Sequence, residues 1–418
     1  MRTTRRWEQQ RWLLDAVIRT IGVDWDQART FYLQAPCGPD AFADFHGIRT
    51  RVQRFDDIAR EFSRAAQRRE RLARDAKTAG HTITARENFY IASVLYGGAQ
   101  WPIFENSPAN LHFNAKKIEC YTRYAQHADH RIERVEIPFR NAAIAGWLHL
   151  PPGHDGERLP CVLVVDGMDG FKEAMVSLHG DKLLSRGLAV LAVDGPGQGE
   201  CTTSGIHVTG DNWFEAGRTI LPWLRARPEV DPARILVYGV SFGSYWATQL
   251  AACGEDVIGC AVALVCHEPG CRTIFETASP TFKLRFMYMA GYEDEDQFDR
   301  FVHTFSLQRV GTTIRCPYLV IAGERDELSP IEHTYRLLEE VRTEKEMIVY
   351  EGERHGLSST SATFLGPDWS NHVADWIHDR ARGVSPAPSR HVFVDAAGNV
   401  HESAWADVRA AGVGTPKH

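Results

Sequence analysis

The chain has 418 residues, of which 44% are apolar and 24% are charged, and its formal net charge is −7. This length exceeds what one ordinary hydrophobic core accommodates, so we expect two domains or one large domain with an appendage. The small negative charge, and the lack of a Lys/Arg-rich run with interleaved aromatics, exclude a typical nucleic-acid-binding protein.

Targeting and redox features of the sequence predict a cytoplasmic protein. The basic residues of Met1–Arg6 are interpreted as a solvated terminus, and the apolar stretch Trp12–Leu14 ends at Asp15, so we expect neither a signal peptide nor a membrane span. The nine cysteines form no C-x-x-C pair and their number is odd, which favours reduced thiols over a disulfide framework. The cluster Cys266–Cys271 contains metal-ligand residue types, but its spacing matches no zinc pattern, so we predict no metal.

Residues 1–128 are predicted to form an N-terminal helical domain. Apolar side chains recur there at spacings of three and four residues, and no alternating pattern interrupts them. The expected helices cover residues 11–21, 55–66, 82–96 and 113–127. Gly97, Gly98 and Pro102 are expected to end the third of these helices.

Several aromatic residues of the helical domain, among them Tyr90 and Trp101, allow two interpretations. Aromatics at helical spacing usually belong to a hydrophobic core. Aromatics also line ligand pockets, which commonly form where two domains meet. We therefore regard Tyr90 and Trp101 as candidate substrate-binding residues, with core packing as the alternative.

From about residue 131 the pattern changes, and residues 129–382 are predicted to form an α/β catalytic domain. Residues 131–139 and 142–150 alternate in polarity and predict an antiparallel pair, whereas residues 159–165 form the continuous apolar run of a strand buried on both faces. Further strands are expected at residues 188–193, 235–240, 257–265, 318–322 and 346–350. Because helices separate them, we predict a mostly parallel, eight-stranded sheet with right-handed crossovers.

Two segments lie outside this alternating pattern. Residues 268–313, rich in aromatic and charged residues, are interpreted as a helical cap insert, in which the acidic run Glu293–Asp296 is expected to be a solvated face. Residues 383–418 are predicted to be a linker and a C-terminal arm, with a small hairpin at 391–401 that could serve in dimer contacts.

The strand at 235–240 leads into Gly239-Val240-Ser241-Phe242-Gly243, followed by helix-forming residues. A strand, a G-x-S-x-G turn and a helix are typical of the nucleophile turn of α/β-hydrolases. The glycines are needed because the serine has a strained backbone and side chains on either side would clash. We therefore predict Ser241 as a nucleophile.

A serine nucleophile needs a base, and the base needs an acid that fixes its tautomer. In α/β-hydrolases these residues follow in the order Ser, Asp/Glu, His. Asp326 lies just after the strand at 318–322, with Glu324 and Glu327 as competing acids, and His355 follows the next strand. The spacing from Gly323 and the Leu-Ser-Pro that follows favour Asp326 as the acid, and the order of the three residues predicts His355 as the general base.

An oxyanion intermediate also requires hydrogen-bond donors. One should be the backbone N–H of Phe242, directly after the serine. The other should come from the loop after the strand at 159–165, where Gly167 lets the backbone turn inward and makes the N–H of Met168 the predicted donor. Asp166 and Asp169 of the same loop are interpreted as loop-stabilising residues.

Three segments, Asp166–Glu173, Asp194–Glu200 and Gly239–Ser244, together with the helical N-terminal domain, resemble one branch of the α/β-hydrolases. That branch includes 2,6-dihydroxypseudooxynicotine hydrolase, the fungal pigment hydrolases that shorten a heptaketide, and the fermentation-respiration switch protein. The resemblance covers roughly residues 80–380 and implies the α/β-hydrolase fold. It also implies the same nucleophile, acid and base on Ser241, Asp326 and His355.

The resemblance implies hydrolysis of a carbon–carbon bond next to a ketone in an aromatic or polyketide-like small molecule. A polar residue near the nucleophile would then protonate or orient the substrate, and Glu268 and His267 are the candidates, with a solvated or capping carboxylate as the alternative for Glu268. The same three residues would equally serve a carboxylesterase, lactonase or acyltransferase. A non-enzymatic binding protein on a hydrolase scaffold is the third hypothesis.

No cofactor is predicted, because Gly195–Gly199 lacks the G-x-G-x-x-G fingerprint of dinucleotide-binding proteins. The expected partners are a small-molecule substrate and a second copy of the chain in a homodimer. Neither nucleic acid nor a membrane is expected as a partner.

Overall fold

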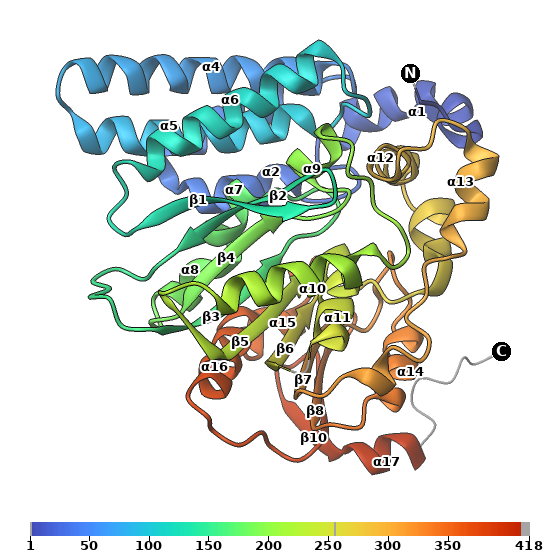
Figure 1. The fold of residues 1–418 in the computed structure, drawn as a ribbon. Helices are drawn as coiled ribbons and strands as arrows, with labels where there is room; N and C mark the ends of the chain where they lie inside the picture. Colours follow the sequence, from blue (N-terminus) through green and yellow to red (C-terminus); the bar gives the residue numbers. More distant parts are fainter. Residues whose placement is uncertain (1, 255, 411–418) are drawn as a thin grey trace.

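The computed structural model describes residues 2–254 and 256–410 of the chain. In the described residues a ten-stranded, mostly parallel sheet has helices on both faces, and a helical block lies beside the edge formed by β1 and β2 (Figure 1). This is the α/β-hydrolase architecture predicted from the sequence.

The strands of the sheet run in the order β1-β2-β4-β3-β5-β6-β7-β8-β9-β10. Neighbours from β4 to β9 pair in parallel, whereas the β1–β2, β2–β4 and β9–β10 pairs are antiparallel. The strands are β1 (Ile132–Phe139), β2 (Ala142–His149), β3 (Leu159–Val165), β4 (Ala189–Asp194), β5 (Val230–Val240), β6 (Val257–Ala263), β7 (Tyr318–Gly323), β8 (Lys345–Tyr350), β9 (Arg390–Val394) and β10 (Val400–Ala404).

The strand count of eight was too low because the C-terminal hairpin extends the sheet. β9 pairs in parallel with β8, from Glu346 opposite Arg390 to Tyr350 opposite Val394. Val394 is fully buried in a core cluster that contains Tyr350. The hairpin, expected as a separate arm, is therefore an integral part of the sheet, and a role for it in a dimer stays a prediction.

The helical block consists of α1 to α6 and two short 3₁₀ turns, and no strand precedes β1 among the described residues. Their bounds are α1 (Arg5–Ile21), α2 (Arg29–Gln34), η1 (Ala35–Cys37), η2 (Pro39–Ala41), α3 (Phe42–Arg51), α4 (Asp57–Thr78), α5 (Thr82–Gln100) and α6 (Pro108–Ala125).

Gly97 and Gly98 do not end a helix, contrary to the prediction, but lie inside α5. A Cβ atom on Gly97 would overlap the ring of Phe171, and one on Gly98 would overlap the ring of Phe62. The two glycines therefore let aromatic rings approach the helix backbone closely. This need outweighs the low helix propensity of glycine.

The core of the helical block extends into the rest of the molecule. Its cluster of buried apolar side chains includes Trp147 of β2, Phe171 of the loop after β3, and Leu284 and Tyr288 of α12. The helical block, the sheet edge and the cap are thus packed together through one core. The division of the chain at residues 128 and 129 stays a prediction.

The remaining helices cover the sheet or form the cap. Those of the sheet are α7 (Lys172–Met175), η3 (Val176–Gly180), α8 (Asp181–Leu184), α9 (Gly199–Thr203), α10 (Asn212–Arg225), α11 (Phe242–Cys253), α14 (Glu332–Glu340), α15 (Ser361–Leu365), α16 (Trp369–Ala381) and α17 (Trp405–Ala410). Those of the cap segment are η4 (Pro269–Cys271), η5 (Thr273–Thr277), α12 (Pro280–Ala290), α13 (Glu295–Val302) and η6 (Gly311–Thr313).

The N-terminal arginines bind the cap, so their interpretation as a solvated terminus was wrong. Arg2 Nε donates to the carbonyl oxygen of Tyr292 at 2.6 Å, and Arg6 Nη2 donates to that of Ala278 at 2.7 Å. Arg5 forms ion pairs with Glu295, Asp296 and Asp299 of α13. We call residues Arg2–Arg6 the N-terminal strap. The acidic run is likewise more than a solvated face, since Glu295 also pairs with the buried Lys283 at 2.8 Å.

Two of the three segments that carry the family resemblance, Asp166–Glu173 and Asp194–Glu200, meet in a buried ionic network. Lys172 Nζ lies 2.7 Å from Glu173, 3.0 Å from Asp194 and 2.5 Å from Glu200. Asp194 also accepts the N–H groups of Lys172 and Glu200 through its two oxygens. Arg134 of β1 pairs with Glu200 at 2.7 Å. The network therefore joins the loops after β3 and β4 to the edge of the sheet.

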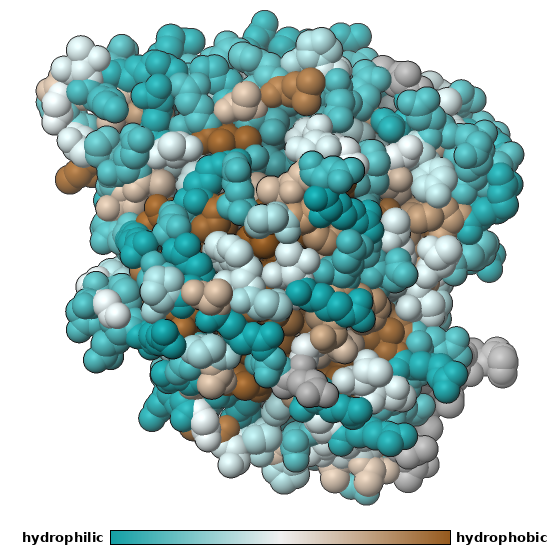
Figure 2. All heavy atoms as spheres, in the orientation of Figure 1, coloured by the Kyte–Doolittle hydropathy of each residue, from teal (hydrophilic) through white to brown (hydrophobic). Residues whose placement is uncertain are grey.

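The face of the molecule in Figure 2 is mostly hydrophilic, with apolar residues visible as separate spots. The most exposed large apolar side chains are Phe364, at 86%, and Trp12, at 74%. None of the described helices has the length and the apolar character needed to cross a membrane.

We predict that Lys172→Met destabilises the protein by roughly 3–5 kcal/mol, because it removes the cation that three carboxylates share and leaves the buried Asp194 without its ion pair. The free energy of unfolding in urea measures the loss. As a control, Arg186→Met removes an ion pair with Asp375, whose side chain is 65% exposed, and should cost under about 1 kcal/mol. Equal losses in the two variants would contradict the importance of the network.

Candidate active site

Ser241 lies in the turn between β5 and α11 with φ 56° and ψ −130°, a left-handed backbone that a serine rarely adopts. The flanking glycines make the turn possible: a Cβ on Gly239 would overlap the carbonyl oxygen of Gly243, and one on Gly243 would overlap that of Val165. The turn thereby holds the serine at the carboxyl edge of the sheet, directly beside the loop after β3.

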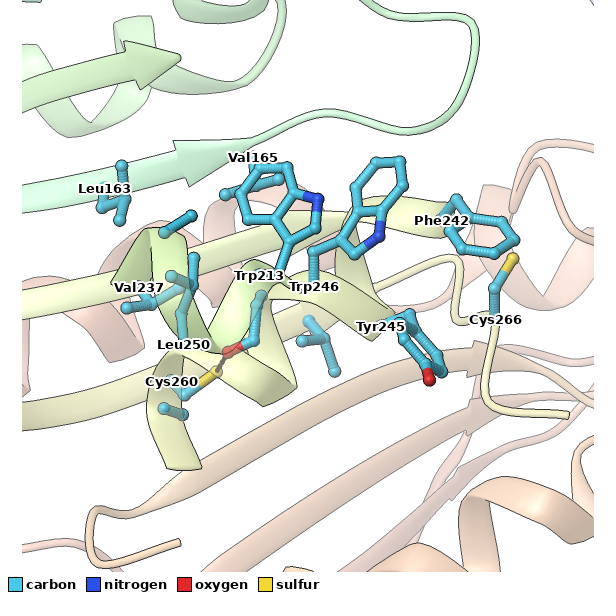
Figure 3. Packing of buried hydrophobic residues seen from close by; sticks show 14 of the residues in the cluster. Leu163, Val165, Trp213, Val237, Phe242, Tyr245, Trp246, Leu250, Cys260 and Cys266 are labelled. Carbon is cyan, nitrogen blue, oxygen red and sulfur yellow. Dashed lines mark hydrogen bonds between the residues drawn. The ribbon is translucent and has the colours of Figure 1, made fainter. Parts of the chain in front are cut away.

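Packing of large aromatic side chains supports this turn (Figure 3). Trp246 of α11 stacks on Trp213 of α10, with ring centroids 5.1 Å apart and an interplanar angle of 11°. Phe242 packs against Trp246 on one side and against Phe286 of the cap on the other, at 5.0 and 4.7 Å. The side chain of Phe242 is thus part of the core. Its backbone N–H is at the first position of α11, where an N–H group has no acceptor within the helix, so it can donate to an external acceptor.

The structure brings Ser241, His355 and Asp326 together in one hydrogen-bonded series. Ser241 Oγ lies 2.9 Å from His355 Nε2, and His355 Nδ1 lies 2.8 Å from Asp326 Oδ2. The other carboxylate oxygen of Asp326 accepts the backbone N–H groups of Leu328 and Ser329 at 2.8 and 3.0 Å. The acid is therefore fixed in place, and the imidazole is oriented towards the serine.

The environment of His355 favours its protonated form. Burial lowers the pKa of the imidazole, but the carboxylate of Asp326, by charge and hydrogen bond, and the charge of Glu327 outweigh this effect. They hold the pKa above its ordinary value of 6.5. Such a base takes a proton readily from a hydroxyl that is attacking a carbonyl.

Glu353, two residues before His355, was not singled out from the sequence. Its carboxylate is fully buried and accepts hydrogen bonds from both the N–H and the hydroxyl of Ser359, from both those of Thr360, and from the hydroxyl of Thr363. These donors lie on the segment that follows the histidine, so Glu353 closes the loop that carries the base. Its signal in the sequence is only a glutamate followed by a Ser/Thr-rich stretch.

The loop after β3 lies against the serine, as expected for an oxyanion loop. A Cβ on Gly167 would come within 2.9 Å of Ser241 Cβ, so the backbone at this position can approach the nucleophile closely. Gln198 Nε2 donates to the carbonyl oxygens of Asp166 and Gly167 at 2.7 and 3.1 Å and fixes the loop from the β4 side. The predicted donor Met168 follows Gly167 and is buried.

Asp166 and Asp169 both have contacts of the loop-stabilising kind that the sequence predicted. Asp166 accepts the N–H of Gly167 at 2.7 Å, and burial raises its pKa to about 7. Asp169 accepts a hydrogen bond from Arg29 of α2 at 2.7 Å, and Arg285 of α12 lies 3.9 Å from it. Arginines from the helical block and from the cap therefore hold the loop. No local sequence pattern indicates these contacts.

Glu268 and His267 lie on the segment after β6, near the acid loop. Glu268 accepts the backbone N–H of Thr273 at 2.7 Å, a capping contact. His267 is buried, contacts Thr334 through Nδ1 at 3.1 Å and has a pKa lowered to about 3 by burial. A substrate role for either residue stays a prediction. The preceding Cys266, which the sequence did not indicate, lies beside the Ser241 hydroxyl and has a raised pKa through burial.

Tyr90 and Trp101 occupy different environments. Tyr90 packs against Tyr124 and Tyr121, with centroids 4.9 and 6.2 Å away, and no described contact joins it to Ser241. Trp101 stacks on the guanidinium of Arg29 at 4.0 Å. It also lines a cavity of about 20 Å³ next to the oxyanion loop, together with Gly97, Gln100, Asn110, Lys117, Asp169, Gly170, Phe171, Gly199, Thr202, Thr203, Arg285 and Tyr288.

A larger hollow of about 470 Å³ lies at the opposite edge of the sheet, between His130 and His154. It is remote from Ser241, because β2 ends there and the parallel strands begin there. Within the described residues no group of three or more His, Cys, Asp or Glu side chains is arranged to hold a metal ion.

Comparisons with known proteins agree with the resemblance noted in the sequence. The family model described as "Esterase FrsA-like" matches residues 61–340. Alpha/beta hydrolase xenA of Xenoacremonium sinensis is 30% identical over 196 residues, which are 44% of this chain and 46% of that protein. The chain thus matches about half the length of the first of these curated relatives.

Two further similarities cover more of the chain. The 2,6-dihydropseudooxynicotine hydrolase of Paenarthrobacter nicotinovorans is 24% identical over 348 residues, 81% of this chain and 88% of that protein. The crystal structure of a 2,6-dihydroxy-pseudo-oxynicotine hydrolase matches with a TM-score of 0.73 and 23% identity, over 86% of this chain and 98% of the other. The shared fold therefore includes most of the helical block.

We predict that Glu353→Gln destabilises the protein by roughly 3 kcal/mol, since an amide group would place its own donors against those of Ser359 and Thr360. Because hydrogen bonds hold the pKa of Glu353 below its usual range despite burial, the wild-type stability should be complete above the unfolded pKa and decrease as the pH falls through the folded value. Urea unfolding at several pH values measures both effects.

The control for this variant is Glu351→Gln on the same loop. The Glu351 carboxylate accepts one backbone N–H, that of Ala396, in an exposed position, so its replacement should cost under about 1 kcal/mol. A loss at Glu353 as small as that at Glu351 would show that the loop does not depend on the buried carboxylate.

Proposed function

The chain belongs to the FrsA-like esterase family, and from this premise we propose that it is a serine hydrolase that cleaves an acyl bond. The observation that carries the proposal is the series from Ser241 Oγ to His355 and from His355 to Asp326, at 2.9 and 2.8 Å, on a serine with a left-handed backbone. Such a series activates a hydroxyl, because the imidazole accepts its proton and the carboxylate stabilises the resulting cation.

In the proposed reaction Ser241 Oγ adds to the substrate carbonyl while His355 Nε2 takes the hydroxyl proton. The N–H groups of Phe242 and Met168 donate to the oxyanion. When the intermediate collapses, the bond to the leaving group breaks and the imidazolium gives it the proton. Water, deprotonated by the same imidazole, then hydrolyses the acyl-enzyme to release a carboxylic acid and free Ser241.

We infer that the leaving group is a carbon, so that the substrate is an aromatic or polyketide-like ketone. Support comes from the relative that is named for hydrolysing 2,6-dihydropseudooxynicotine, which matches 81% of this chain, including helices of the N-terminal block. A carbon leaving group requires stabilisation as an enolate or a phenol-like ring and a proton from the imidazolium. Glu268, His267, Tyr90 and Trp101 remain the proposed substrate-binding residues.

A carboxylesterase is the second candidate, favoured by the description of the matching family as esterases. The two reactions share every catalytic step except the protonation of carbon. A panel of acyl-phenol ketones and matched aryl esters separates them, with product masses as the readout. Ester turnover without any ketone cleavage would eliminate the carbon–carbon reaction.

We predict that Ser241→Ala lowers kcat by at least about 10⁴-fold on any substrate of the wild-type protein. The change removes only a hydroxyl, so the unfolding midpoint should be nearly unchanged. Covalent labelling by a fluorophosphonate, detected by intact mass, should disappear as well. Ser244→Ala in the same turn is the control, since its hydroxyl accepts the N–H of Cys266 and is not a nucleophile. Labelling that persists in Ser241→Ala would refute the assignment, and absence of labelling in the wild type would favour a non-enzymatic binding protein.

The rate of fluorophosphonate labelling should rise with pH through a single transition centred above pH 6.5, because His355 must be neutral to accept the proton and its pKa is raised. Asp326→Asn removes the largest favourable charge and should move the transition to lower pH while reducing the plateau. Labelling rates across pH 5 to 9 give both values. A wild-type transition below pH 6 would contradict the proposed environment of the base.

A further inference from the structure

The loop after β7 carries three carboxylates, and all three bind the loop after β8. Glu324 accepts the N–H of Gly352 at 2.8 Å, Asp326 contacts the imidazole of His355 at 2.8 Å, and Glu327 accepts the backbone N–H of His355 at 2.9 Å. The acids that compete for one role in the sequence therefore occupy three separate positions. Two of them, Asp326 and Glu327, converge on the same residue.

Glu327 holds His355 from the backbone side while Asp326 holds it from the ring side. The Glu327 side chain is 34% exposed, so its charge is only partly screened by water. Its charge adds to that of Asp326 in favouring the imidazolium. A backbone N–H fixed by a carboxylate also limits rotation of the peptide that carries the imidazole.

None of the other described titratable groups around His355, apart from Asp326, places a negative charge on the histidine as Glu327 does. Arg354 Nε lies 3.5 Å from the Glu327 carboxylate, but its side chain is 63% exposed. Glu353 is bound by amide and hydroxyl donors on the side of residues 359–363. Cys266 is a neutral thiol, because burial raises its pKa. Asp326 and Glu327 are thus the two anions that act directly on the base.

We propose that Glu327 is a positioning residue for His355, which anchors the backbone of the base and supplies a second negative charge to the imidazolium. This inference rests on the proposed function, since it assigns His355 the role of general base. In the reaction the imidazolium forms when the serine proton is taken and disappears when the leaving group is protonated. A second anion at the histidine stabilises the state between these two transfers.

The test compares Glu327→Gln with the matched control Glu324→Gln. Glutamine keeps an acceptor for the His355 N–H but has no charge, and Glu324 is on the same loop with its contact to Gly352 rather than to the histidine. The pKa of His355 is read from ¹³Cε1-histidine NMR, with the resonance assigned by its absence in His355→Gln. We expect Glu327→Gln to lower this pKa by about half a unit, and Glu324→Gln to leave it within about 0.1–0.2 units.

The pH profile of fluorophosphonate labelling provides the second readout, and its midpoint should move by the same amount as the NMR titration. Equal pKa values in wild type and Glu327→Gln, with both proteins folded, would overturn the proposal. Because the NMR titration needs no turnover, it decides the role of Glu327 even where the labelling shows that the proposed hydrolase function is wrong.

A third variant separates the effect of the Glu327 charge from the effect of the position of its carboxylate. Glu327→Asp keeps the charge but shortens the side chain, so the pKa of His355 should stay near the wild-type value while the plateau rate of labelling falls several-fold. If Glu327→Gln does not fold, this variant and the wild type at low and high salt still test the charge, since added salt should screen the partly exposed carboxylate of Glu327 and lower the pKa of His355. A plateau rate in Glu327→Asp equal to that of the wild type would overturn the positioning role.

Discussion

The site depends on the close approach of β5 and α11 to the loop after β3. The left-handed backbone of Ser241 requires this approach, and the glycines at 239 and 243 permit it. A side chain at residue 243 would strike the carbonyl oxygens of Val165 and Asp166, and Ser241 would then move away from the loop after β3. A strained residue of this kind costs about 1–3 kcal/mol. The stacked tryptophans and the Phe242–Phe286 contact stabilise the elements on both sides of the turn and hold it against relaxation.

Buried charged groups fix the loops around the serine, in addition to apolar contacts. Lys172 and Asp194 connect the loops after β3 and β4, Arg29 holds Asp169 from the helical block, and Glu353 closes the loop after β8. These groups are buried, so each is costly if left alone and strongly directional when paired. The segments by which the family is recognised thus include Lys172 and Asp194 as well as Ser241, whereas Arg29 and Glu353 lie outside the range that the family model matches.

The sequence predicted the strands and the Ser-Asp-His order because both follow from local patterns: apolar runs define parallel strands, and residues after such strands meet at one edge of the sheet. It could not reveal contacts that join distant segments. The sequence predicts a helix stop at Gly97 because the packing of this residue against Phe171 leaves no mark in the local pattern. The sequence predicts the hairpin of β9 and β10 as an arm because β8, with which β9 pairs, lies 44 positions earlier in the chain. Arg29 and the strap were missed for the same reason, whereas the partners of Glu353 lie six to ten residues after it and form no recognised motif.

The N-terminal strap has a consequence for how the protein is made. Arg2 and Tyr292 are separated by 290 positions in the chain. At synthesis rates of about 5–20 residues per second, the strap leaves the ribosome roughly 15–60 seconds before its partners on the cap exist. The strap can therefore secure the cap only after the sheet up to β6 has been synthesised, while β7 to β10 still follow. A nascent chain consequently carries its serine turn before α12, whose Phe286 packs against Phe242, has been made.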